Sequence, residues 1–143
     1  MDGAARRRSL GRQGEDTAAA YLEGLGYELI ARNWRTRAGE LDIIARDGDW
    51  LVFVEVRTRR AARGGAPPML GSPEESVTPR KQMRLVAMSE AYLFELPWHG
   101  SWRIDVIALE LWPDGGPAGG IARLNHLRDA VGGPAGGPAG GAG

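Results

Sequence analysis

Residues 39–59, GELDIIARDGDWLVFVEVRTR, decide the fold, because they read as two apolar runs joined by an Asp-Gly turn. Asp-Gly between runs rich in valine, isoleucine and phenylalanine is the strongest short-range signal of a β-hairpin. The tight turn needs a positive φ, which glycine adopts without strain and aspartate tolerates. The stretch therefore predicts a hairpin whose loop is Asp47-Gly48.

This loop sets a register in which Arg46 faces Asp49, Asp42 lies opposite Phe53 and Glu40 lies opposite Glu55. Since residues directly across share a face and each strand alternates faces, the two faces can be listed. The first is predicted to carry Glu40, Asp42, Ile44, Leu51, Phe53, Glu55 and Arg57. The second is predicted to carry Leu41, Ile43, Ala45, Trp50, Val52, Val54 and Val56. Both faces are apolar in the middle, which is typical of central strands covered on both sides.

Acidic side chains gather at one end of the first face, where burial costs free energy unless a cation compensates the charge. Asp42 and Glu55 are predicted to lie near enough to share one hard cation, and Mg²⁺ typically binds one or two carboxylates together with waters and phosphate oxygens. The ion would polarise a phosphodiester, and Arg57 could stabilise the developing negative charge. The alternative is structural: in it, Glu40 forms an ion pair with Arg57 or Arg37.

The composition narrows the class of protein. With 143 residues and no internal repeat, the chain is expected to form one domain, and a net charge of zero gives no global argument for nucleic acid. The absence of cysteine excludes disulfides, thiolate metal sites and cysteine nucleophiles. No apolar run reaches about 18 residues and none follows the basic residues 6–8, so neither a membrane span nor a signal peptide is expected. The expected location is the cytoplasm.

Two kinds of site are excluded by their missing motifs. His99 and His126 are the only histidines, and neither has a ligand pattern or a nucleophile motif nearby, which argues against a zinc site and a Ser-His-Asp triad. No P-loop motif is present either, so nucleotide hydrolysis of that kind is not expected.

The rest of the chain alternates helical and strand patterns. A helix is predicted from Leu10 to about Leu25, with Glu15 in line with its apolar stripe, and a second from Thr78-Pro79 to about Leu96. The buried stripe of the second helix is predicted to be Met83, Val86, Ala87, Ala91 and Phe94. Further strands are predicted over 27–34, 102–111 and 121–127, the last at an edge.

These elements divide the chain into three parts. A flexible basic arm is expected over 1–9, a domain over 10–130 and a disordered Gly/Pro/Ala tail over 131–143. Inside the domain, residues 58–76 are predicted to form a long Gly/Pro-rich loop that is basic at its start.

Several motifs in order carry a family resemblance. The segments L-D and V-E-V-R resemble the PD-(D/E)-x-K signature of restriction-endonuclease-like folds, with Asp42, Glu55 and Arg57 in its three positions. Glu15 resembles the extra acid of archaeal Holliday-junction resolvases. The chain is also similar to the bacterial YraN-like family of unassigned function, through Gly14-Glu15, Gly39-Glu40-Leu41-Asp42, Phe53-Val54-Glu55-Val56-Arg57, Ser76-Val77-Thr78, Lys81-Gln82 and Arg103-Ile104-Asp105-Val106.

The resemblance implies an α/β restriction-endonuclease-like fold, a mixed central β-sheet flanked by helices. It also implies a metal-dependent endonuclease that uses Mg²⁺ or Mn²⁺ on DNA, including branched DNA. Asp42 and Glu55 would be the metal ligands, Glu15 an auxiliary acid and Arg57 the phosphate contact, so that all four are candidate catalytic residues. The expected contacts to the nucleic-acid backbone are Arg59, Arg60, Lys81, Gln82 and Arg84.

The chain departs from the nuclease signature at two positions. Leu41 replaces the proline, which is harmless because the strand sets the position of the acid. Arg57 replaces the lysine, and arginine cannot shed a proton to act as a base. Either Arg57 acts through its charge alone while the ion activates water, which is the favoured reading, or Lys81, the only lysine, reaches the site.

Two non-catalytic readings stay open. The chain could be a binding or adaptor module that keeps the fold for DNA, RNA or a protein partner, or a structural protein whose acids form ion pairs. Junction resolvases of similar fold work as dimers, so a homodimer is a further expectation, although no pattern in the sequence decides it.

Overall fold

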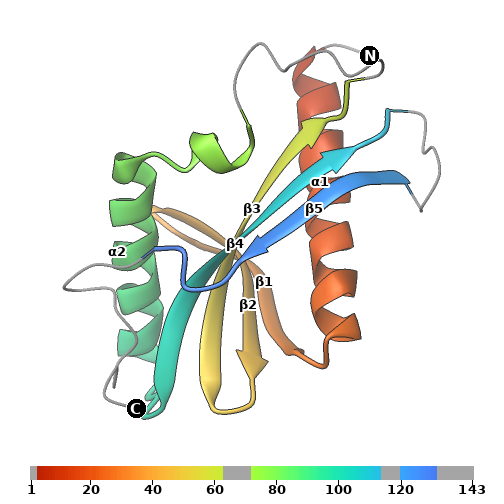
Figure 1. Cartoon of the computed structure of the whole chain (residues 1–143). Helices are drawn as coiled ribbons and strands as arrows, with labels where there is room; N and C mark the ends of the chain where they lie inside the picture. Colours follow the sequence, from red (N-terminus) through yellow and green to blue (C-terminus); the bar gives the residue numbers. More distant parts are fainter. Residues whose placement is uncertain (1–2, 63–71, 114–119, 132–143) are drawn as a thin grey trace.

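The computed structural model of the chain describes residues 3–62, 72–113 and 120–131, and over these residues one mixed sheet lies between two helices (Figure 1). The sheet has five strands in the order β1-β2-β3-β4-β5, all antiparallel to their neighbours except the parallel pair β3 and β4. The elements are, in chain order, α1 (Gly3–Gly24), β1 (Glu28–Thr36), β2 (Gly39–Asp47), β3 (Trp50–Arg60), the 3₁₀ helix η2 (Glu74–Ser76), α2 (Pro79–Glu95), β4 (Ser101–Leu111) and β5 (Ile121–Leu127). The predicted α/β class with a mixed, helix-flanked sheet is confirmed.

The predicted hairpin is present as β2 and β3, but its loop is one residue further along. Asp47 pairs with Trp50 and Ile44 with Phe53, so the loop is Gly48-Asp49 and the predicted register is wrong. Gly48 has a φ of 58°, the conformation that glycine adopts without strain, and it occupies the first loop position.

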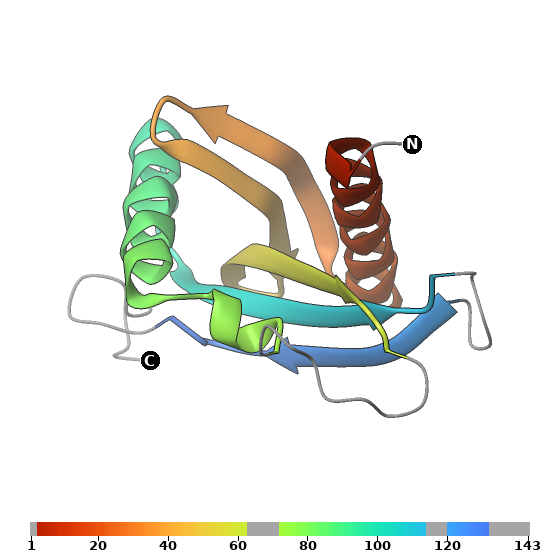
Figure 2. The ribbon, with the colours of Figure 1, turned by 90° about the horizontal axis from the view of Figure 1, so that it is seen from above.

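β2 and β3 separate soon after they leave this turn, and this separation shapes the site. Their pairing ends at Ile43 and Val54, whereas β1 stays paired with β2 as far as Gly39 and β3 stays paired with β4 as far as Arg60. Figure 2 shows β1 and β2 rising away from β3 and β4 between the two helices. At the point of separation, the backbone N–H of Val56 donates to Asp42 Oδ2 over 2.8 Å.

Each face of the sheet carries its own apolar core. The face under α1 buries Ile43, Ala45, Val52, Val54 and Val56, and the face under α2 buries Leu41, Ile44, Leu51 and Phe53. The predicted division of the hairpin is therefore correct for its central residues. It is wrong for Leu41, which packs on the α2 side because alternation of faces is lost where β2 leaves β3.

The bounds of α2 agree with the prediction, but its buried face does not. Thr78 caps the helix by accepting from Lys81 N over 3.3 Å, and Pro79 is the first helical residue. The buried residues are Leu85, Met88 and Ser89, while the predicted core residues Met83 and Phe94 are 74% and 92% exposed. Of the predicted stripe, only Val86 packs against the core.

The other predicted elements are present with small shifts of their ends. β5 has the predicted bounds, and β1 and β4 differ from theirs by one or two residues at an end. α1 begins at Gly3, so the helix includes part of the expected arm. Much of the predicted loop, at 63–71, and of the predicted tail, at 132–143, lies outside the described residues. Within the described part, neither helix is long and apolar enough to span a membrane.

Candidate active site

A pocket of about 470 Å³ lies where β2 leaves β3, between α1 and the first turns of α2. Its walls come from four elements, α1, β2, β3 and α2. The lining residues that bear on its chemistry are Glu15 from α1, Glu40 and Asp42 from β2, Glu55 and Arg57 from β3, and Lys81 and Arg84 from α2. All four predicted catalytic residues therefore line one pocket.

Three carboxylates of this pocket lie close enough to share a cation. One oxygen each of Glu15, Glu40 and Asp42 lies within 4.8 Å of the others. Asn33 of β1, with its amide nitrogen turned towards the acids, donates to Glu15 Oε1 over 2.8 Å and to Glu40 Oε1 over 2.7 Å. Asn33 was not foreseen, because a polar residue on an edge strand carries no sequence signal that assigns it to a site on its neighbour.

Burial raises the pKa of two acids of the pocket, Asp42 and Glu15. Burial, followed by the nearby Glu55 carboxylate, raises the pKa of Asp42 to about 8. Burial also raises the pKa of Glu15, and the charges of Asp42 and Glu40 act in the same direction. At neutral pH Asp42 therefore retains a proton, and a bound cation would take its place.

Arg57 is held at the rim by two neighbours. Its Nε donates to Ser76 Oγ over 2.7 Å, and its Nη1 lies 3.6 Å from Glu55 Oε2. The ion pair that was predicted as an alternative for Glu40, with Arg57 or Arg37, is not formed. Arg35 Nε donates to Glu40 Oε2 over 2.7 Å instead, because Arg35 and Glu40 are directly paired across β1 and β2.

Lys81 faces the pocket from the first turn of α2. Burial lowers its pKa, and the neighbouring Arg57 charge lowers it further, while Glu55 acts in the opposite direction. Lys81 therefore lies close to the acids and to Arg57. This position agrees with the alternative in which Lys81, and not Arg57, reaches the site.

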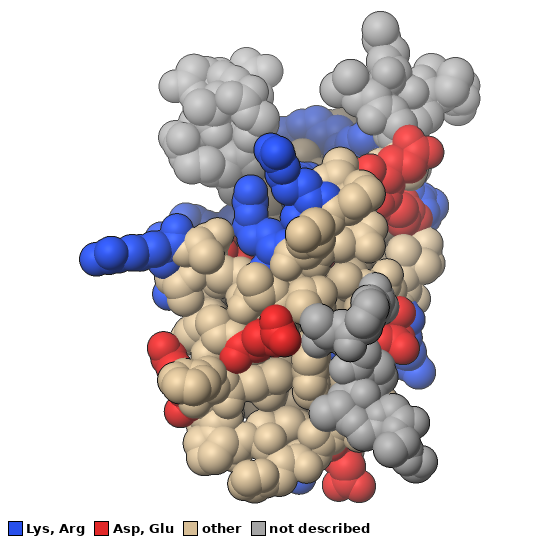
Figure 3. Space-filling model, turned by 90° about the vertical axis from the view of Figure 1, so that its left-hand side faces the viewer, with Lys and Arg blue, Asp and Glu red and all other residues tan. Residues whose placement is uncertain are grey.

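The predicted nucleic-acid contacts divide into two groups. Lys81 and Arg84 line the pocket. Figure 3 views the molecule from the side that carries α2, and Lys and Arg side chains gather there at the end nearest the start of this helix. Gln82, Arg59 and Arg60 do not line the pocket. Gln82 Nε2 donates to the carbonyl of Val77 over 3.1 Å, and Arg59 pairs with Glu110, so both side chains have structural partners.

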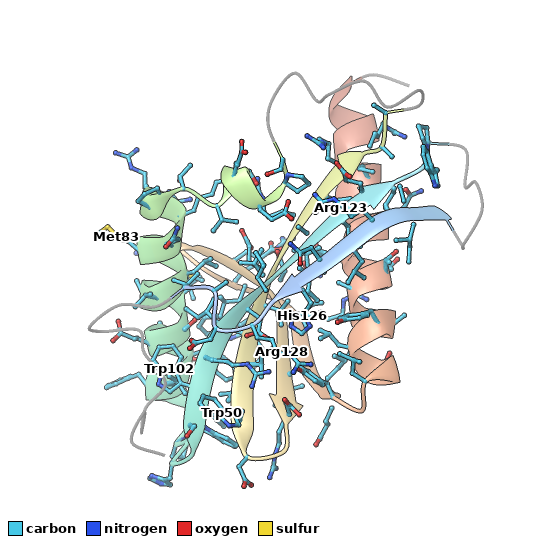
Figure 4. The ribbon with its side chains drawn as sticks, viewed as in Figure 1. Trp50, Met83, Trp102, Arg123, His126 and Arg128 are labelled. Carbon is cyan, nitrogen blue, oxygen red and sulfur yellow. The ribbon has the colours of Figure 1, made fainter. Side chains whose placement is uncertain are left out.

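An ion-pair cluster, also unforeseen, supports the segment that carries Ser76. Arg123 of β5 donates to both carboxylate oxygens of Glu74, over 2.6 and 2.9 Å, and to Glu110 over 3.0 Å (Figure 4 labels Arg123). Asn125 donates to Glu74 over 2.8 Å. Local sequence patterns could not reveal this cluster, because it joins residues about 50 positions apart.

Comparisons with known proteins identify the family of the chain. The family model described as "Uncharacterised protein family UPF0102" matches residues 14–109. A UPF0102 protein of Chloroflexus aurantiacus is 48% identical over 128 residues, which cover 88% of this chain and 95% of that protein. Another, from Rhodococcus opacus, is 45% identical over 123 residues, covering 85% of this chain and 95% of that protein. The expected YraN-like membership is thereby confirmed: the chain belongs to the uncharacterised protein family UPF0102.

Proposed function

We propose that the protein is a metal-dependent endonuclease that hydrolyses phosphodiester bonds of DNA, through a site of the restriction-endonuclease-like kind. The observation that carries the proposal is the convergence, in one pocket, of Glu15, Asp42 and Glu55 with Arg57 and Lys81. These residues come from four different elements and are up to 66 positions apart along the chain, from Glu15 to Lys81. A set of acids facing a set of cations across one opening suits a substrate with negatively charged phosphates.

The donor set fits a hard divalent cation. Asp42, Glu55, Glu15 and Glu40 offer only carboxylate oxygens, the ligands that Mg²⁺ and Mn²⁺ prefer. The raised pKa of Asp42 points the same way, because crowded, buried carboxylates gain most from a nearby cation. When bound, such an ion supplies Lewis-acid polarisation of the phosphodiester and lowers the pKa of water.

The cationic residues have separate roles in this proposal. Arg57, oriented by Ser76, binds a phosphate oxygen and stabilises the charge that develops during hydrolysis. Lys81, whose pKa is lowered, can exchange a proton closer to neutral pH than an exposed lysine can. Arg84 contributes positive charge to the same opening.

A second candidate function is binding of DNA without cleavage. Arg57 in the lysine position of the nuclease signature favours it, since arginine keeps the phosphate contact and removes the proton acceptor at that position. The two functions differ in whether the carboxylates of the pocket take part in hydrolysis.

A cleavage assay separates the two functions. The full chain is incubated with linear, flap and four-way-junction DNA, with Mg²⁺, Mn²⁺ or EDTA, beside Asp42→Asn/Glu55→Gln and Arg57→Lys. The matched control is Glu23→Gln, an exposed acid of α1 outside the pocket. We expect metal-dependent cleavage that is lost in the double variant and kept in the control.

The outcomes are distinct. Cleavage that survives in Asp42→Asn/Glu55→Gln would show a contaminant and remove the site assignment. Retarded migration of DNA in a gel, without cleavage under any metal, would favour the binding module. More cleavage by Arg57→Lys than by the natural sequence would show that the arginine weakens an otherwise competent site.

A further inference from the structure

The outer face of α2 carries an apolar stripe that packs against nothing in the described part of the chain. Met83, Ala87, Ala91 and Phe94 follow one another at helical spacing, opposite the buried Leu85, Met88 and Ser89 that are named above. Met83 is 74% exposed and Phe94 is 92% exposed. Figure 4 shows Met83 on the side of α2 that points away from the sheet. Exposed apolar side chains that are grouped in this way are typical of an interaction surface.

Two opposite charges flank the stripe along the same edge. Arg84 lies near the start of α2 and Glu95 is its last residue; 11 residues apart, they are about three helical turns from each other on one side. Both side chains are exposed, and neither takes part in an ion pair with another described residue. Both oppose the dipole of their own helix, because a cation stands near its N-terminal end and an anion at its C-terminal end.

This arrangement is complementary to itself. When two α2 helices run antiparallel, Met83 of one chain meets Phe94 of the other, and Ala87 meets Ala91. In the same alignment Arg84 meets Glu95. The midpoint of each of these pairs of positions lies near residue 89, so one two-fold axis can relate all of them. The two alanines allow the helix axes to approach closely, and each charge then lies beside the opposite charge of its partner.

We propose that the outer face of α2 binds a second copy of the chain, in a symmetric antiparallel helix pair. The pairing uses Met83, Ala87, Ala91 and Phe94 as its apolar centre and two Arg84–Glu95 contacts at its ends. This inference does not rest on the nuclease proposal, and it is tested without DNA or metal. Since Lys81 and Arg84 lie near the start of α2, the pair would set the two pockets at opposite ends of the interface.

Sedimentation of the full chain over a range of concentrations measures the pairing. We expect a monomer–dimer equilibrium whose dissociation constant rises about tenfold or more in Met83→Ser/Phe94→Ser. The matched control is Ile30→Ser, which removes an exposed apolar side chain, 41% exposed, from β1. A chain that is monomeric at every concentration, or a dimer that the stripe variant leaves unchanged, overturns the proposal.

A charge exchange tests the orientation. Arg84→Glu and Glu95→Arg should each weaken the dimer, and the combined variant should restore it, because both contacts are reversed together. Failure of the combined variant to regain dimerisation contradicts the antiparallel arrangement. Oligomeric state is the only readout, since Arg84 also lines the pocket.

Cross-linking tests the register in a chain that has no cysteine of its own. A mixture of Ala87→Cys and Ala91→Cys chains should form more disulfide-linked dimer than either chain alone, and Ala20→Cys, an exposed alanine of α1, should form none. A monomer whose position-91 thiol is protected from a maleimide would show that the chain's own remaining residues cover the stripe. A monomer whose thiol reacts freely would show that the stripe is open to a different partner. Either result overturns the proposal that a second copy of the chain binds there.

Discussion

Asp42 is the residue of the pocket whose protonation the fold changes most. Its carboxylate accepts from Val56 N over 2.8 Å, which favours the charged form, yet burial and Glu55 outweigh that contact and raise its pKa to about 8. Ionisation of the buried Asp42 therefore costs free energy of folding. In the absence of a cation, replacing this acid by a neutral isostere should stabilise the fold, which indicates that the acid serves a purpose other than stability.

The first prediction concerns the stability of Asp42→Asn. Between the ordinary pKa of 3.8 and the folded value of about 8, the folded chain holds a proton that the unfolded chain has lost. This contribution to stability is therefore complete below the ordinary pKa and is lost as the pH rises through about 8. In EDTA we expect Asp42→Asn to be more stable than the natural chain at about pH 9, by on the order of 1–2 kcal/mol, with a smaller difference near about pH 6.

Urea unfolding at both pH values measures this difference, with Glu23→Gln as the control for the loss of an exposed acid. The same pH dependence in Asp42→Asn and in the natural chain would contradict the raised pKa.

Gly14 shows how one residue of α1 positions its neighbour, Glu15. A Cβ at position 14 would lie 1.8 Å from Thr58 Oγ1 and 2.8 Å from its Cβ, so α1 approaches β3 more closely there than any side chain allows. We expect Gly14→Ala to destabilise the fold by about 1–3 kcal/mol through overpacking, and to displace Glu15 from the pocket.

The measurement is again the free energy of unfolding, and the control is Gly24→Ala in the same helix. No atom lies within 4 Å of a Cβ built at position 24, so this change should be neutral or slightly stabilising. Partial recovery of stability in Gly14→Ala/Thr58→Ala would locate the clash at Thr58. Equal effects of the two glycine variants would argue against close packing of the helix.

At the scale of elements, η2 is a short segment that orients a side chain of the pocket. Ser76 accepts from Arg57 Nε over 2.7 Å and donates to the carbonyl of Pro73 over 2.5 Å. The segment is fixed to β5 through Glu74, whose pKa the adjacent Arg123 lowers to about 2. The cluster on β5 therefore supports Arg57 from outside the pocket.

The third prediction is that Glu74→Gln loosens this segment. Because the charge–charge contact with Arg123 is partly exposed, the expected loss of stability is only about 1 kcal/mol. The larger effect should be faster amide hydrogen exchange over residues 74–77, together with reduced DNA binding if Arg57 contacts phosphate. The stabilisation is present above the ordinary pKa of 4.5 and is lost as the pH falls from there towards about 2.

Glu75→Gln is the control, since Glu75 is exposed and adjacent in the chain. Unchanged exchange in Glu74→Gln would show that the segment is held by other contacts.

At the scale of the whole molecule, the acids of the pocket come from three parts of the fold. Glu15 comes from α1, Asp42 from the strand pair β1 and β2, and Glu55 from the strand pair β3 and β4. A cation bound by these acids would join the parts, so metal binding and folding should be linked.

The fourth prediction follows from this linkage. Mn²⁺ or Mg²⁺ should raise the unfolding temperature of the natural chain, corresponding to about 2.7 kcal/mol at a metal concentration of 100 times the dissociation constant. The shift should be larger at higher pH, because the metal competes with the proton held by Asp42. Differential scanning fluorimetry with and without EDTA measures it.

The same titration of Asp42→Asn/Glu55→Gln should show little or no shift. A shift of equal size in that variant would place the metal elsewhere on the molecule.

The sequence by itself determined the local elements of this protein. The Asp-Gly sequence between two apolar runs indicated the hairpin, though not its loop position, Thr78 and Pro79 specified the start of α2, and β5 has the bounds that its pattern predicts. These features depend on neighbours in the chain, whose capping groups and turn geometry can be read directly. The motifs also led to the correct family.

Only the tertiary structure decided which surfaces and side chains meet. Both sides of α2 carry apolar residues, so periodicity alone favoured Met83 and Phe94 for the core, whereas the folded chain buries Leu85 and Met88 in the core cluster on that face of the sheet. The register of the hairpin depended on which loop position took the positive φ of Gly48. The pocket beside residues 39–59 forms only because β2 separates from β3, and Asn33 lies beside its acids. The sequence could not show either feature, because contacts between distant parts of the chain leave no local pattern.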